Sequence, residues 1–224
     1  VLSLTKICIF GQEEVNVGES CFQDCLSLST VEFLDKQPIK KLNFDSQAFY
    51  KCEKLEEISL NAHELIVGEK CFNGTNLKKF EFDNEIITIN DYSFHTLSSL
   101  EFVSIPYATK VSLNNNSFED CKNIKNIVIG GCSNVFIGNH CFSGNLNLKL
   151  IELSAGDLHI GNSAFANCSS IEKLELKDIK KTYIGNNAFE NCKLLKELLI
   201  NNSNNDEINL KDFEYDLFLD NYCF

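Results

Sequence analysis

One short pattern recurs along almost the whole chain of 224 residues. Its frame is I-G-x-x-A/C-F-x-x-C-x-x-L-x-x-I-x-L, which residues 184–200 follow closely. The fixed Phe returns at intervals of 22 to 27 residues, at Phe22, Phe49, Phe72, Phe94, Phe118, Phe142, Phe165 and Phe189. A single copy holds too few apolar side chains to bury a core, whereas stacked copies bury a continuous one. The sequence therefore predicts a solenoid.

The two halves of the pattern predict different local structures. The segment L-x-x-I-x-L alternates at its end, so that Leu198 and Ile200 face inward while Leu199 faces outward in a strand. In I-G-x-x-A-F-x-x-C, the Gly (or Asn) suits a turn with positive φ, and A-F-x-x-C is long enough for one helical turn. We therefore predict an α/β solenoid with short parallel strands on its concave face and turns or single helical turns on its convex face.

Partial copies of the pattern stand at both ends of the chain. Residues 4–9, LTKICI, match the second half of a preceding copy, and Ile208, Phe213, Leu219 and Tyr222 match a degenerate ninth copy. Residues 1–224 therefore form a single predicted domain of about eight full repeats. Because a solenoid needs polar caps to keep its terminal apolar faces out of water, we expect the native protein to be longer.

The repeat resembles a known family. The frame C-x-x-L-x-x-I-x-[IL] followed by I-G-x-x-A-F-x-x-C resembles the BspA-like, or Treponema pallidum-type, leucine-rich repeat. Residues 99–106, SLEFVSIP, match the L-x-x-I-x-I-P element of that class. Departures are local: Thr75, Leu97 and Asn145 replace the Cys of the frame. The resemblance implies a leucine-rich-repeat fold and a cell-surface or secreted protein that binds host or matrix proteins.

Most of the eleven Cys occupy two positions of the repeat. Cys25, Cys52, Cys121, Cys168 and Cys192 stand three residues after the Phe, and Cys21, Cys71 and Cys141 stand just before it. Ala48, Ala164 and Ala188 fill the second position in other copies, and interchange with Ala predicts small, buried thiols. Disulfides and metal binding remain as alternatives. Cys8 lies off both positions, and we expect it to face out of its strand.

Other chemistry leaves little trace in the sequence. The four His show no H-E-x-x-H spacing, and no G-x-S-x-G element, P-loop or dinucleotide fingerprint is present. We therefore predict no catalytic, cofactor-binding or metal-binding residue, and no enzyme. A formal net charge of −12 argues against a nucleic-acid partner, which requires clustered Lys and Arg. No apolar run approaches the length of a membrane span, so we predict no membrane insertion within this segment.

The outward positions of the predicted strands suggest where a partner binds. In the middle copies these positions place Phe102, Val128 and Leu150 on the concave sheet. Neighbouring copies place carboxylates there, at Glu81, Glu152 and Glu175. An apolar patch rimmed by charge is typical of a protein-binding site, although scattered exposed apolar residues are common on any surface. These six residues are the predicted partner-binding site.

Two classes of function follow from these observations. The first is a non-enzymatic protein-binding or adhesion module of a cell-surface or secreted protein, which binds through the concave sheet. The second is a cytoplasmic protein-interaction scaffold, which the thiol-rich core also fits. A purely structural spacer is a third possibility. The sequence does not identify the protein partner.

Overall fold

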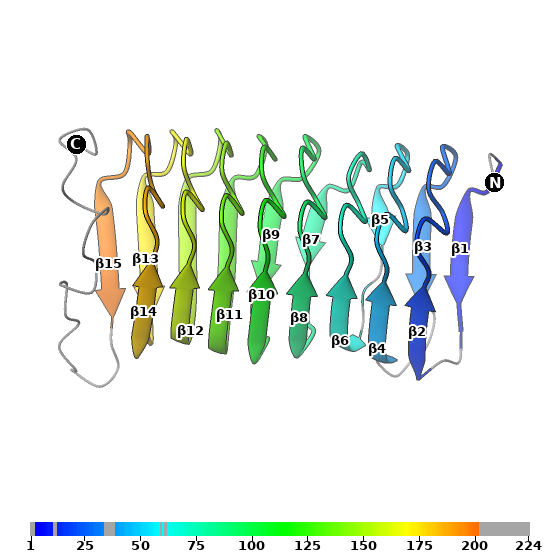
Figure 1. Cartoon of the computed structure of the whole chain (residues 1–224), viewed down its shortest axis with the longest axis horizontal. Helices are drawn as coiled ribbons and strands as arrows, with labels where there is room; N and C mark the ends of the chain where they lie inside the picture. Colours follow the sequence, from blue (N-terminus) through cyan, green and yellow to red (C-terminus); the bar gives the residue numbers. More distant parts are fainter. Residues whose placement is uncertain (1–2, 11–12, 34–38, 59, 61, 202–224) are drawn as a thin grey trace.

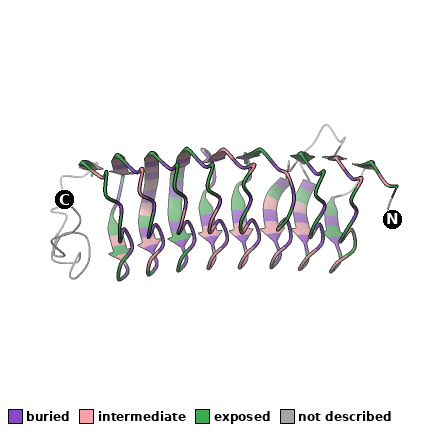
Figure 2. Cartoon of the chain, turned by 90° about the horizontal axis from the view of Figure 1, so that it is seen from above, coloured by how far each residue is buried: buried purple, intermediate pink, exposed green. Residues whose placement is uncertain are grey.

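In the computed structural model the chain winds into a stack of similar coils (Figure 1). The structure describes residues 3–10, 13–33, 39–58, 60 and 62–201, so the predicted ninth repeat lies outside the described residues. The stack runs nearly straight in Figures 1 and 2, with no pronounced concave side. Each coil contributes residues to two parallel ladders of strands, which we call the first sheet and the second sheet.

The first sheet contains the strands that the L-x-x-I-x-L segment predicts. They are β1 (Lys6–Ile9), β3 (Thr30–Phe33), β5 (Glu57–Ile58), β7 (Lys79–Glu81), β9 (Phe102–Ile105), β13 (Lys173–Lys177) and β15 (Glu197–Asn201). The first halves of two long strands, β11 (Asn126–Ile137) and β12 (Leu150–Ile160), complete it. Pairing is parallel throughout, and the register joins equivalent positions of successive repeats, as in Asn126 with Leu150. The predicted strand frame is confirmed.

The second sheet was not predicted. It contains β2 (Glu14–Val17), β4 (Ile39–Phe44), β6 (Ala62–Val67), β8 (Ile86–Ile89), β10 (Lys110–Leu113), β14 (Lys181–Ile184) and the second halves of β11 and β12. Each of these strands ends at the Ile, Val, Leu or Phe that precedes the Gly position of the repeat. Burial alternates along them, for example exposed-buried-exposed-buried in β2. Each coil therefore contains two strands and a turn (Figure 1).

Of the two predicted alternatives for A-F-x-x-C, turns or a single helical turn, the structure shows turns. Among the described residues no helix forms, and A-F-x-x-C is a series of turns. In the coil of Phe49, the N–H groups of Phe49 and Lys51 donate to Cys71 and Asn73 of the next coil, at 3.0 and 2.9 Å. The intervening N–H groups of Tyr50 and Cys52 donate three residues back, so the i-to-i−4 bonds of a helix do not form. The fold is an all-β solenoid, not α/β.

The prediction about positive φ also needs correction. The left-handed residue stands two positions after the Gly, as in His140 (φ 53°) and Ser163 (φ 52°), and a second one stands two positions after the Phe, as in Asn167 (φ 62°). The Gly itself is needed for close packing. A Cβ at Gly161 would lie 2.7 Å from the backbone N of Asn139 in the preceding coil. At Gly161 the close approach of the preceding coil, rather than the direction of the turn, therefore requires glycine.

The core is a column of inward side chains from all three parts of the coil (Figure 2). The eight repeat phenylalanines stack in one row, with neighbouring ring centroids 4.9 to 5.4 Å apart. The inward Val, Ile and Leu of both sheets close around this row, and nearly all of them are fully buried. One continuous hydrophobic cluster therefore runs through the stack.

The thiols are mostly where the repeat predicts. Eight of the ten described Cys are buried, and Cys8 is exposed as expected. Cys21 is also exposed, contrary to the prediction. The equivalent Cys141 lies against the preceding turn, with its Sγ 3.2 Å from Ser117 Oγ. Because the turn that holds Cys21 is the first of the stack, it has a neighbouring turn on one side only.

Candidate functional site

The six residues of the predicted partner-binding site lie on one face of the first sheet. They come from five strands that follow one another in the sheet, β7, β9, β11, β12 and β13. The parallel register sorts the outward positions into two rows. One row contains Lys79, Phe102, Asn126, Leu150 and Lys173, and the other contains Glu81, Ser104, Val128, Glu152 and Glu175. The structure thus brings all six residues together.

The apolar centre of this face consists of Phe102, Val128 and Leu150. Val128 stands on β11 between the strands that carry Phe102 and Leu150, and all three are partly buried. Val128 lies diagonally beside both, on the neighbouring strand and in the other row. Phe102 and Leu150 are two strand spacings apart, about 9.6 Å, with Asn126 between them. The Nζ of Lys125 lies 5.7 Å from the centre of the Phe102 ring and also contacts Glu101 at 2.6 Å. We call these three residues the apolar patch.

The carboxylates that flank the apolar patch are not equivalent. Glu152 pairs with Lys177 at 3.3 Å, and Glu175 pairs with both Lys173 and Lys177. Hydrogen bonds from these two ammonium groups lower the pKa of Glu175 below its ordinary value. Because each of these carboxylates is matched by a cation, the C-terminal side of the patch carries no strong net charge. Glu81 has no cation within 4.0 Å among the described residues, so the negative character lies on the N-terminal side.

A hollow of about 470 Å³ adjoins Glu81. It lies between β5 and β7. Its charged lining residues are Glu32, Glu56, Glu57, Glu81, Lys78 and Lys79, and Thr30 and Ile58 also line it. Lys78 pairs with Glu56 at 2.8 Å, and Glu32 pairs with Lys6 at 2.8 Å. The hollow is therefore a polar edge of the apolar patch, with more carboxylates than ammonium groups in its lining.

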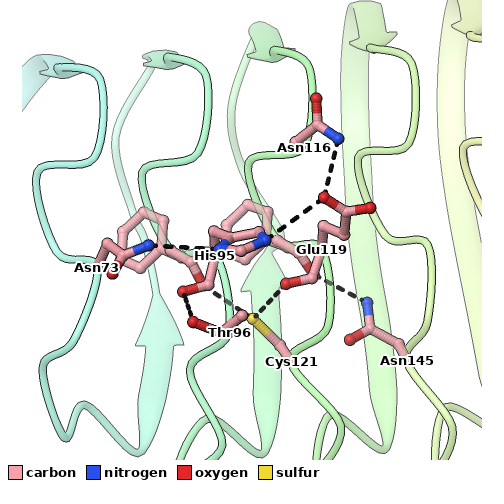
Figure 3. A network of polar contacts seen from close by, with 9 residues as sticks. Asn73, His95, Thr96, Asn116, Glu119, Cys121 and Asn145 are labelled. Atoms are coloured by element: carbon pink, nitrogen blue, oxygen red, sulfur yellow. Dashed lines mark hydrogen bonds and ion pairs between the residues drawn. The ribbon is translucent and has the colours of Figure 1, made fainter.

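The turn side of the stack holds a polar network around His95 (Figure 3). His95 lies between Asn73 Nδ2, 3.4 Å from its Nδ1, and Glu119 Oε2, 3.5 Å from its Nε2. Asn116 Nδ2 donates to the same Glu119 oxygen at 2.9 Å. Thr96, the nearest hydroxyl, donates to the backbone carbonyl of His95 at 2.7 Å. The network links neighbouring coils, and its one thiol, Cys121, is buried.

The Cys of the repeat donates a hydrogen bond to the preceding coil. Cys52, Cys121, Cys168 and Cys192 donate from Sγ to the carbonyls of Phe22, Phe94, Phe142 and Phe165, at 2.9 to 3.2 Å. Burial raises the pKa of Cys52 to about 11 and that of Cys141, in the other Cys position, to about 12. A thiol with such a pKa stays protonated near neutral pH and is a poor nucleophile or metal ligand. These cysteines are structural.

Sequence reasoning missed a second surface feature, on the outward face of the second sheet. Phe136, His159 and Tyr183 occupy equivalent positions on β11, β12 and β14. Their rings stack, with centroids 4.7 and 4.6 Å apart. Phe136 and Tyr183 are 38% and 52% exposed. The sequence could have indicated this feature through the alternating segments NVFI, DLHI and KTYI, each of which comes directly before a Gly. In a strand, this alternation places an aromatic residue outward in three successive copies.

The comparisons with known proteins settle the family. The model of the BspA type leucine rich repeat region matches residues 15–149 and 111–222, in six copies. The chain belongs to this family. Proteins of the leucine-rich-repeat class typically mediate protein interactions and are generally not enzymes. No curated protein matches the chain.

Two solved structures are similar to this family member. A leucine-rich repeat protein from Bacteroides ovatus is 20% identical over 88% of this chain and 64% of its own, with a TM-score of 0.48. The chain thus spans less than two thirds of that protein. A leucine rich cell surface protein from Faecalibacterium prausnitzii is 16% identical over 88% of this chain and 79% of its own, with a TM-score of 0.30.

The described residues contain no group of three or more His, Cys, Asp or Glu side chains placed to hold a metal ion. The described part of the chain also forms no helix with the length and apolar character of a membrane span.

Proposed function

We propose that this protein is a non-enzymatic binding module that docks a folded protein partner on the outward face of its first sheet. The observation that carries the proposal is the apolar patch of Phe102, Val128 and Leu150. These side chains are outward on three adjacent strands, and the core beneath them is complete without them. Apolar residues that are not needed for folding and lie in one group are the usual centre of a protein interface.

The surroundings of the apolar patch also support docking. On its C-terminal side, Glu152 and Glu175 are held by Lys173 and Lys177 in a network of ion pairs. An interface commonly has an apolar centre and a polar rim that stays solvated. The long, regular sheet also offers a flat surface across many coils, and solenoids use such surfaces for extended binding. Phe102, with Lys125 beside its ring, is the aromatic anchor of this proposed interface.

The test compares variants of the two sheets. Val128→Glu and Phe102→Ala change the apolar patch, whereas Thr88→Glu introduces the same charge as Val128→Glu at an outward, partly buried position of the second sheet. Binding to a panel of purified extracellular-matrix proteins is measured by surface plasmon resonance, and thermal stability by circular dichroism. We expect at least a tenfold loss of affinity for Val128→Glu and Phe102→Ala, with Thr88→Glu unchanged and all melting temperatures close to the wild type. Equal binding by all three variants would refute the proposal.

Adhesion at the cell surface is our proposal for the setting of this activity, supported by membership of the BspA-type family. A cytoplasmic scaffold is the second candidate, and one observation favours it: Cys8, on β1, is an exposed free thiol, which suits a reducing compartment. The two settings make opposite predictions for this thiol. Mass mapping of protein isolated from its native source should find Cys8 oxidised or bridged in a secreted protein, and alkylatable in a cytoplasmic one.

A further inference from the structure

The second sheet has its own groove, on the opposite part of the coil from the apolar patch. Two rows of outward side chains form its walls. The polar row contains Lys110, Asn134, Asp157 and Lys181, and the aromatic row contains Ser112, Phe136, His159 and Tyr183. The groove between the rows has a volume of about 380 Å³ and crosses β10, β11, β12 and β14. Neighbouring outward positions on one strand are two residues apart, so the two walls stand about 6.7 Å from each other.

The stacking of the rings decides what the aromatic row can bind. The ring planes of Phe136 and His159 differ by 14°, and those of His159 and Tyr183 by 13°. Each ring therefore covers the face of its neighbour, and the ring edges point to solvent. Ring edges carry partial positive charge and attract carboxylate and carbonyl oxygens. His159 is stacked on both faces, and Phe136 and Tyr183 are each stacked on one, so edges predominate along the row and favour an acidic ligand over a neutral glycan.

The polar row supplies cations at its two ends. Lys110 and Lys181 have no carboxylate within 4.0 Å among the described residues, although the protein as a whole carries a net charge of −12. Between them, Asn134 Nδ2 donates to Asp157 at 3.4 Å. The ends of the row thus attract negative charge, while Asp157 disfavours it near the middle. A nucleic acid, with its uninterrupted line of phosphates, does not fit this alternation.

We propose that this groove binds an extended acidic peptide segment of a partner protein, with acidic side chains four residues apart and an aromatic or apolar residue between them. The spacing follows from the sheet. Lys110 and Lys181 are three strand spacings apart, about 14 Å. An extended chain covers about 14 Å in four residues. The two acidic side chains reach the two lysines, and the central side chain packs on the ring edges beside Asn134 and Asp157.

The probe is a fluorescein-labelled synthetic peptide containing Glu-Ser-Phe-Ser-Glu, whose binding is followed by fluorescence anisotropy at low salt. We expect saturable binding that weakens as salt is added, because the contacts at Lys110 and Lys181 are exposed ion pairs. A peptide of the same composition with the two Glu adjacent should bind at least fivefold more weakly. Equal binding of the two peptides would overturn the spacing argument.

Protein variants distinguish binding in this groove from binding elsewhere on the molecule. Lys110→Glu, Lys181→Glu and Tyr183→Ser should each lower the affinity at least fivefold, while the charge-matched Lys122→Glu, on an exposed turn, should leave it unchanged. Val128→Glu on the first sheet should also leave it unchanged, so the groove and the apolar patch can fail independently. Circular dichroism melting checks that each variant is folded. Loss of binding with Lys122→Glu alone would overturn the proposal.

Two other occupants are outcomes of the same experiments. If wild-type protein binds anionic phospholipid vesicles in sedimentation assays, and Lys110→Glu abolishes this without peptide binding being seen, the groove is a membrane contact and the peptide proposal fails. If sedimentation velocity shows a dimer that Tyr183→Ser dissociates, a second copy of the chain is the occupant, and the proposal fails in the same way.

Discussion

Two stretches of the solenoid differ in how the buried carbonyl of the repeat Phe is hydrogen-bonded. Between Phe142 and Phe189 the pattern is regular except at Asn145: Cys168 and Cys192 donate to the Phe carbonyl of the preceding coil. Between Phe49 and Phe94 the pattern breaks. Leu97 stands where Cys would donate to the Phe72 carbonyl, and Thr75, in the coil of Phe72 itself, donates to that carbonyl at 2.8 Å. The comparison shows that a hydroxyl can take the place of the thiol as donor. It also shows that the Phe49 carbonyl, to which Thr75 does not donate, is paired through the backbone N–H of Cys52 at 3.1 Å.

The sheets of the two stretches differ as well. In the regular stretch the first sheet continues through β12, β13 and β15. In the irregular stretch the buried Asn84 donates from Nδ2 to the carbonyls of Leu60 and Ala62 in the preceding coil, so a side-chain amide joins these two coils. The second sheet and the turns run through both stretches among the described residues.

The largest expected effect tests whether the core is equally complete in both stretches. Phe142 and Phe72 are fully buried and stacked on both sides by neighbouring rings. Phe142→Ala and Phe72→Ala should each lower the free energy of unfolding by about 3–5 kcal/mol. Urea denaturation followed by circular dichroism measures both. If Phe72→Ala lowers the free energy of unfolding by less than half as much as Phe142→Ala, the core of the irregular stretch is more loosely packed than that of the regular stretch.

The next effect concerns the contact between coils. A Cβ at Gly161 would lie 2.7 Å from backbone atoms of the preceding turn, whereas a Cβ at Gly18, in the first turn, meets no atom within 4 Å. Gly161→Ala should therefore cost about 1–3 kcal/mol through overpacking. Gly18→Ala should be neutral or slightly stabilising, since it restricts the unfolded chain. The two melting temperatures check this. Equal losses would mean that backbone flexibility, and not the distance between coils, requires the glycine.

The sequence predicted the parts of this fold that depend on the inward side chains. The repeat interval placed Phe22 to Phe189 in one row, and the alternation in L-x-x-I-x-L placed Phe102, Val128 and Leu150 outward. Interchange of Cys with Ala indicated burial, which holds except at Cys21, where a neighbouring turn is missing. Each of these inferences depends on the size or polarity of a side chain at a given position of the repeat.

The errors concern backbone hydrogen bonds between coils, which no single repeat displays. The spacing of Phe and Cys fits a helical turn, yet the N–H of Phe49 bonds to Cys71 of the next coil. The second sheet was not predicted because its strands, such as Ile86–Ile89, are short and only their last residue belongs to the repeat frame. The groove beside Phe136 could not be predicted without that sheet. The pairing of Glu152 with Lys177 also required the register between strands, because Lys177 is 25 residues from Glu152 in sequence.

A smaller effect follows from the donors to the Phe carbonyls. Asn145 replaces Cys in the coil of Phe142, and its Nδ2 donates to the carbonyls of Phe118 and Phe142 at 3.1 and 2.8 Å. Its Oδ1 is buried without a hydrogen-bond partner. Asn145→Cys should reproduce the thiol-to-carbonyl hydrogen bond that Cys168 and Cys192 make, and it removes the unpaired oxygen. The free energy of unfolding should rise by about 1 kcal/mol.

The control for this substitution is Asn145→Leu, which also removes the unpaired oxygen but offers no donor. It should lower the free energy of unfolding by about 1–3 kcal/mol, because the Phe118 carbonyl is left unpaired in the core. Both values come from urea denaturation. A stabilising Asn145→Leu would contradict the view that the buried Phe118 carbonyl requires a hydrogen-bond donor from residue 145.

The smallest effect concerns the aromatic row, which only the regular stretch carries: in the irregular stretch Ile66 and Thr88 fill the same row. Burial between Phe136 and Tyr183 lowers the pKa of His159 below its ordinary value. Above pH of about 6.5, His159 is neutral in both the folded and the unfolded state and has no effect on stability. As the pH falls through this value, the unfolded chain takes up a proton first, so stability decreases until the lower pKa of the folded state is passed. His159→Gln should remove this part of the acid sensitivity, measured as the urea midpoint on both sides of the histidine pKa. A pH dependence identical to the wild type would show that the ring stack leaves His159 free to ionise.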